Sequence, residues 1–336
     1  MINQITTKLM FLVYITQYNK ISQNWYNFYV SQKVERKISR KRVKRNFSTI
    51  GLLLLIYAMF VLVLPYAFYT YMVDTNSSIL KDEILYYGIY FITLFFGTVI
   101  PFSIMRRFSK IKIKRITRSI SASFVDLFVQ TIVFFTICVA LTFVSTTIAN
   151  YIGFEGKLIS SIGFNYDSSN LSNHLYVFLL IVVSPILEEY AFRGVLLNSL
   201  SRYGKLFALV ASSLIFALAH SNFAEMLPAF AMGISLGKTS LRYKSIQPSI
   251  VIHILFNAFI YLLCVIPSNV AGYMAYGLVA ICILAIYLYL SGRYERIVIQ
   301  KTKTNSIANS LFFSRVSVIL SLLIMVIYTV LMTFTY

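Results

Sequence analysis

The sequence predicts an all-α fold, a polytopic integral membrane helical bundle with about nine transmembrane helices. Hydrophobic residues make up 58% of the 336 residues and charged residues 12%, and the mean hydropathy is +0.76. This composition is too apolar for an ordinary soluble domain. The apolar residues form runs long enough to cross a bilayer as helices, and the basic residues lie in the short segments between them.

The predicted spans follow one another from residue 48 onward. A transmembrane helix needs about 20 predominantly apolar residues. We place such runs at 48–73, 84–105, 124–149, 175–200, 206–221, 226–241, 246–267, 270–290 and 315–335. The fifth and sixth runs are short, so a re-entrant or strongly tilted course is an alternative for them.

The predicted organisation has four parts. They are a basic cytoplasmic or interfacial N-terminal segment (1–47), N-terminal transmembrane helices (48–174), a transmembrane core that carries polar motifs (175–267) and C-terminal transmembrane helices (268–336). The first part combines aromatic side chains with a basic run, which is typical of a segment on an anionic membrane surface. A basic tail without regular structure is the alternative.

The distribution of charge predicts an orientation in the cell membrane. A net charge of +19 is compatible with nucleic-acid binding, but the basic residues fall between apolar runs and form no basic face. The basic clusters all lie in loops on one side of the predicted spans, and the opposite loops are mainly acidic. By the positive-inside rule we expect a multi-pass protein with a cytoplasmic N-terminus, whose partner is the lipid bilayer and not nucleic acid.

The segment LEEYAFRG, residues 187–194, places two carboxylates and a guanidinium inside an apolar run. A charge at the bilayer centre costs about 2.5–3.5 kcal/mol on insertion scales, so these residues need an explanation. Glu189 and Arg193 are four apart on one helical face, and we expect them to pair. Glu188 lies about 100° around the helix without such a cation, which leaves it free to act as a base. A structural polar cluster that ties helices together is the alternative.

A proline and three further polar residues in the apolar runs are expected to lie near this segment. Pro185 cannot donate a backbone hydrogen bond, so the helix is expected to kink or widen beside Glu188. His220 ends the segment FALAH, and His253 and Asn257 share one helical face four residues apart. A single histidine in a membrane helix more often forms a hydrogen bond between helices than acts as a catalyst. Counting about 1.5 Å of rise per residue brings these groups to compatible depths, where they can meet in one site.

These residues resemble the three motifs of the CPBP intramembrane proteases, also called the Abi or CAAX prenyl protease family. The matches are Glu188, Glu189 and Arg193 to EExxxR, Phe216 and His220 to FxxxH, and His253 and Asn257 to HxxxN. Each motif is weakly specific alone, but all three occur in order, each in an apolar run. The resemblance covers residues 175–267 and implies that this core is catalytic. The activity it implies is that of a membrane endopeptidase, a hydrolase of peptide bonds.

The resemblance also implies a role for each motif residue. Glu188 and His220 would activate water, His253 and Asn257 would stabilise the oxyanion, and Arg193 would hold Glu189 and order the site. The implied substrate is a peptide or a membrane protein, with or without a lipid group.

The family has also been called a metalloprotease family. Glu188, His220 and His253 could supply three zinc ligands and leave an open position for water. The sequence contains no HExxH motif, in which two histidines one turn apart flank the base. We therefore favour a glutamate mechanism without a metal or other cofactor, and keep zinc as the alternative.

Two other classes of function compete with a protease. The resemblance also allows a non-catalytic membrane protein that confers bacteriocin self-immunity or regulates a sensor partner, but the complete set of motif residues favours an enzyme. A transporter would use intramembrane acids as an ion relay. The sequence shows one polar cluster and no paired, interrupted helices in two related halves, which disfavours a transporter.

Overall fold

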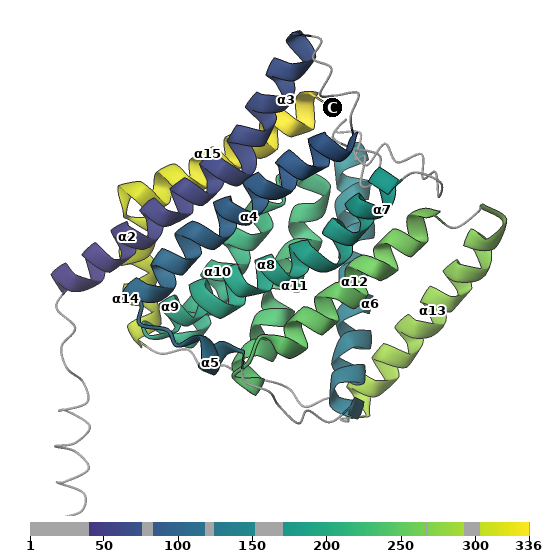
Figure 1. Ribbon diagram of the computed structural model, residues 1–336. Helices are drawn as coiled ribbons and strands as arrows, with labels where there is room; N and C mark the ends of the chain where they lie inside the picture. The colour runs from purple at the N-terminus through teal and green to yellow at the C-terminus, as the bar shows by residue number, and fades with distance from the viewer. Residues whose placement is uncertain are drawn as a thin grey trace, which may run out of the picture. The chain divides into compact units, whose positions relative to one another are not determined.

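A computed structural model describes residues 40–75, 83–117, 124–151, 171–265, 268–291 and 303–335. The regular structure of these residues is entirely helical (Figure 1), which confirms the all-α class. Most of the predicted N-terminal segment 1–47 and most of the loop between the third and fourth runs lie outside the described residues.

Each predicted apolar run corresponds to a helix or to a series of consecutive helices. The first three runs form α2 (Arg40–Ala58), η1 (Met59–Val63) and α3 (Leu64–Asp74), then α4 (Glu83–Phe108), then α6 (Phe124–Tyr151). The fourth run forms α7 (Leu171–Phe178), η3 (Leu179–Val183), α8 (Ser184–Glu188), η4 (Glu189–Leu197) and α9 (Asn198–Ser201). The later runs form α10 (Lys205–Ala219), α11 (Phe223–Tyr243), α12 (Gln247–Val265), α13 (Ser268–Leu290) and α15 (Val316–Thr335). The short helices α5 (Ile113–Ile116) and α14 (Lys303–Phe313) lie between these runs.

Within the described residues, four helical stretches are long and apolar enough to cross a membrane, as judged by length and composition. They are Lys41–Asp74, Ile84–Phe108, Leu127–Tyr151 and Leu171–Ser201. Shorter apolar helices occur at Lys205–Ala219, Gln247–Leu262, Val279–Leu288 and Val316–Met332. The described residues are therefore all-helical with four long candidate spans, and the count of nine spans stays a prediction.

The fourth run departs from regular α-helix on both sides of Pro185. The π-helical segments η3 and η4 flank the single turn α8, so the distortion predicted at Pro185 is confirmed. In a π-helix each N–H donates to the carbonyl five residues earlier, and Ser184 donates in this way to Leu179. The next carbonyl, that of Leu180, would need the N–H of residue 185, which proline lacks. That carbonyl is thus left for another donor.

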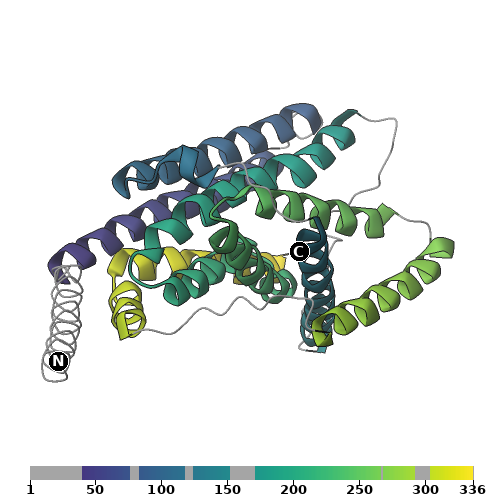
Figure 2. The ribbon, with the colours of Figure 1, turned by 90° about the horizontal axis from the view of Figure 1, so that it is seen from below.

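The series α7 to α9 contacts α4, α10, α11 and α12, and α13 lies beside α6 (Figures 1 and 2). An aromatic cluster joins several of these elements. The ring of Phe192 in η4 lies 5.1 Å from that of Phe216 in α10, 5.7 Å from Phe102 in α4 and 5.9 Å from Tyr57 in α2. All four side chains are buried, so they hold η4 among its neighbours.

Small residues let α10 and α11 approach closely. Gly233 and Gly237 of α11 are four apart, the spacing by which small residues bring two helix backbones together. A Cβ atom at Gly233 would lie 2.6 Å from the Cβ and 2.8 Å from the Cα of Ser213 in α10. At Gly237 the near contact would be the flexible end of Leu209, at 2.5 Å. This crossing positions α10, whose C-terminal end carries His220.

We expect Gly233→Ala to destabilise the protein by about 1–3 kcal/mol, the usual cost of overpacking a tight contact. The added methyl group would overlap the main-chain Cα of Ser213, which cannot move without shifting α10. Thermal unfolding of the purified protein in detergent measures the change. Gly237→Ala is the matched control and should have the smaller effect, because only the end of the Leu209 side chain must move. Equal melting temperatures for wild type and Gly233→Ala would contradict this packing.

Candidate active site

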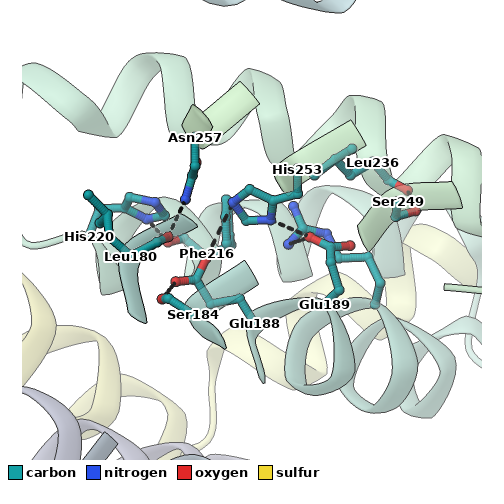
Figure 3. Close-up of polar contacts among 11 residues, drawn as sticks. Leu180, Ser184, Glu188, Glu189, Phe216, His220, Leu236, Ser249, His253 and Asn257 are labelled. Atoms are coloured by element: carbon teal, nitrogen blue, oxygen red, sulfur yellow. Dashed lines mark hydrogen bonds and ion pairs between the residues drawn. The ribbon is translucent and has the colours of Figure 1, made fainter. Parts of the chain in front are cut away.

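Glu189, the first residue of η4, anchors the polar cluster. One oxygen, Oε1, lies 2.8 Å from the Nη1 of Arg193 and 2.9 Å from the Nδ1 of His253 in α12 (Figure 3). The side chain of Glu189 is 0% exposed, and those of Arg193 and His253 are 3% and 2% exposed. The expected pair of Glu189 with Arg193 is therefore present, and the same carboxylate oxygen also bonds α12.

Phe216 of α10 supports this pair from one side. The guanidinium carbon of Arg193 lies 4.0 Å from the centre of the Phe216 ring, in range for a cation–π contact. The same ring is 4.6 Å from the ring of His220 and 6.1 Å from that of His253. The aromatic residue of the FxxxH segment thus contacts the basic side chains of all three motifs.

Glu188 has a different environment from Glu189. It is 23% exposed, and its Oε1 accepts a hydrogen bond from the hydroxyl of Ser184 at 2.5 Å. The other oxygen, Oε2, is 3.7 Å from the Nε2 of His253, which is too far for a direct hydrogen bond. One glutamate is therefore enclosed and paired, whereas the other is partly open with one oxygen free of a direct bond.

His220 lies at the end of α10, where the chain turns into α11. Its Nδ1 is 2.8 Å from the carbonyl of Phe216. A carbonyl only accepts, so Nδ1 carries the proton and Nε2 is left as an acceptor. Ser221 then adopts a left-handed φ of 56°, and the Asn222 side chain caps α11 by accepting from the N–H of Ala224 at 2.9 Å. The cap and the turn together hold the imidazole at the helix end.

The family resemblance implies that Glu188 and His220 together activate water. Among the atoms of the described residues, these two side chains share no hydrogen bond or ion pair. The imidazole within ion-pair range of Glu188 is instead that of His253. The structure thus brings His253 between the two glutamates, a contact that the spacing of the motifs does not indicate.

Asn257 of α12 binds the distorted helix directly. Its Nδ2 donates to the carbonyl of Leu180 at 3.0 Å, the carbonyl that Pro185 leaves without a backbone donor (Figure 3). An amide nitrogen carries two hydrogens, so one remains for another acceptor. One turn before His253, Ser249 donates to the carbonyl of Leu236 in α11 at 3.0 Å. These two bonds fix α12 on both sides of His253.

The sequence analysis missed two members of this cluster. Ser184 contacts Glu188 and lies four residues before it, so the helical spacing was the available signal. The carbonyl of Leu180 carries no side-chain signal at all. It becomes an acceptor because of the π-helical hydrogen bonding and Pro185, which appear only in the folded chain.

The side chains named as zinc ligands do not form a three-ligand site. Within the described part of the chain, no group of three His, Cys, Asp or Glu side chains is arranged to hold a metal ion. His253 directs Nδ1 at the carboxylate of Glu189, and His220 directs Nδ1 at a backbone carbonyl. The residues present do not fit the metal in this arrangement, so we derive no step through it.

Comparisons with known proteins concern the same part of the chain. Residues 170–259 match the family described as type II CAAX prenyl endopeptidase Rce1-like. The chain is similar to the membrane-embedded CAAX protease MroQ of Staphylococcus aureus (strain USA300), with 34% identity over 93 residues, or 26% of this chain. This alignment spans 38% of the length of that relative. No solved structure matches the chain.

We expect Arg193→Ala to lower the free energy of unfolding by about 3–5 kcal/mol, because it leaves the Glu189 carboxylate buried without its cation. Loss of the side chain also removes the group that packs on the Phe216 ring. Thermal unfolding in detergent and abundance in the membrane fraction both report the loss. Arg202→Ala is a control, since Arg202 is an exposed arginine that donates to a backbone carbonyl. A stable, abundant Arg193→Ala protein would disprove the anchoring role of the pair.

Proposed function

We propose that the protein is an intramembrane endopeptidase of the CAAX-protease type, because residues 170–259 match the type II CAAX prenyl endopeptidase Rce1-like family and part of the chain is similar to a membrane-embedded CAAX protease. Its substrates in this proposal are peptides or membrane proteins, with a prenylated C-terminal peptide as the first candidate. The reaction is hydrolysis of a peptide bond by a water molecule that Glu188 activates. The domain proposed to carry it is the core 175–267.

The observation that carries the proposal is the contrast between the two adjacent glutamates. Glu189 is 0% exposed and pairs with Arg193, whereas Glu188 is 23% exposed. Carboxyl groups that differ in this way take different roles in an active site. The enclosed carboxylate suits the positioning of other groups, and the open one suits contact with water and substrate.

In the proposed reaction a water molecule lies against the Oε2 atom of Glu188. Glu188 takes a proton from this water. At the same time the water oxygen attacks the carbonyl carbon of the scissile peptide bond. The carbon–nitrogen bond then breaks, and the same proton passes from Glu188 to the leaving amine. The Nε2 atom of His220 is an acceptor in the tautomer that the structure favours, which supports a role as a second contact of the water.

Two groups are proposed to stabilise the oxyanion. Asn257 retains one N–H after it binds the Leu180 carbonyl. His253 has its Nδ1 held by Glu189, so Nε2 is the ring atom that donates to the oxyanion when the imidazole is protonated. A single donor aimed at a developing oxyanion is typically worth about 2.7–4 kcal/mol. His253 and Asn257 would act from one face of α12.

We place the site in a multi-pass membrane protein with nine spans and a cytoplasmic N-terminus, as the basic loops indicate. Nine spans put the C-terminus outside the cell. A reporter fused after Tyr336 should therefore read as external, and one fused before Met1 as cytoplasmic. A cytoplasmic signal from the C-terminal fusion would contradict the count, because it requires an even number of spans.

Glu188→Gln tests the proposed base. An amide of equal size cannot accept the proton of water, so cleavage should be lost. The variant should keep near-normal abundance and thermal stability, because it places no new charge in the protein interior. The first measurement is quantitative proteomics of membrane fractions from cells with wild type or Glu188→Gln, which should reveal a substrate that accumulates uncut. The second is cleavage of a farnesylated peptide ending in a CAAX sequence by purified protein in detergent.

The control is Asp74→Asn, the same type of change at an exposed carboxylate at the end of α3, and it should cleave as wild type does. Cleavage by Glu188→Gln at the wild-type rate would disprove the base. The two strains could have identical membrane proteomes while Glu188→Gln still gives the cells the same phenotype as wild type. That result would favour a binding role such as immunity. Loss of wild-type cleavage on chelation, restored by zinc, would replace the glutamate mechanism with a metal-dependent one.

A further inference from the structure

The hydroxyl of Ser184 makes the shortest polar contact of the proposed base. Ser184 begins α8, one turn before Glu188 on the same face of the helix. The Oγ–Oε1 distance is 2.5 Å, at the short end of the range for a hydroxyl that donates to an ionised carboxylate. This bond occupies one oxygen of Glu188 and leaves the other, Oε2, on the side of His253.

The hydroxyl of Ser184 does not follow the usual pattern of a helical serine. Such a serine commonly donates to the carbonyl four residues earlier, as Ser201 of the same series does to Leu197 at 2.6 Å. For Ser184 that carbonyl belongs to Leu180, and it accepts from the side chain of Asn257 at 3.0 Å. The serine hydroxyl donates to the Glu188 carboxylate instead.

We infer that Ser184 is a positioning residue for the proposed reaction, which holds the Glu188 carboxylate so that Oε2 meets the attacking water. The inference rests on the proposed function, because it takes Glu188 to be the base. Ser184 itself contacts neither the water nor the peptide bond. Its effect is on the orientation of the Glu188 carboxylate.

The test is Ser184→Ala in the full-length protein, with the farnesylated CAAX peptide as substrate. We expect kcat to fall roughly tenfold, the effect of losing one hydrogen bond to a charged group. KM should stay that of wild type, because the hydroxyl does not touch the substrate. Ser184→Thr, which keeps a hydroxyl, should restore most of kcat.

Ser201→Ala is the matched control, because it removes a hydroxyl of the same helical series that bonds only a backbone carbonyl. It should leave kcat and KM unchanged. Wild-type kcat in Ser184→Ala would overturn the inference and leave the proposed function intact. A slow Ser184→Ala matched by an equally slow Ser184→Thr would assign the serine to packing and also overturn it. A wild-type protein that cuts neither the peptide nor any membrane protein would overturn the proposed function itself.

Discussion

One oxygen of the buried Glu189 carboxylate holds the site together, since it meets both Arg193 of η4 and His253 of α12. Such a cluster has a high desolvation cost, and its members are stable only while each opposite charge or donor is in place. The Phe216 ring completes the enclosure from α10. Three helical elements that are distant in sequence, η4, α10 and α12, are therefore positioned around a single carboxylate. This arrangement also fixes the position of the neighbouring Glu188.

The distortion of the helix is the second constraint, and side chains compensate for it. Pro185 and the π-helical segments leave backbone carbonyls without their regular donors, which is costly where no water can take their place. Asn257 satisfies the Leu180 carbonyl, and Asn198 donates to the carbonyls of Arg193 and Gly194. The Asn257 bond also docks α12 on the fourth run. Helix irregularity and site assembly are thus parts of one arrangement.

Tight helix packing supports the polar cluster from outside. Gly233 brings α11 close to Ser213 of α10, and the aromatic contacts of Phe192 hold η4 beside α4 and α10. Protein interiors transmit small shifts because they are densely packed. The position of His220 at the end of α10 depends on this packing as well as on its own hydrogen bond to Phe216.

The sequence by itself determined the helical class, the approximate course of the apolar runs, the polar residues of the core and the pairing of Glu189 with Arg193. Each of these follows from local composition or from spacing along one helix. Only the tertiary structure decided that His253 lies between the two glutamates, that Ser184 donates to Glu188 and that Asn257 binds the Leu180 carbonyl. Contacts between helices depend on how the helices rotate and cross, and the Leu180 acceptor depends on backbone hydrogen bonding that shifts from α to π. Neither property is carried by the spacing of residues within a single helix.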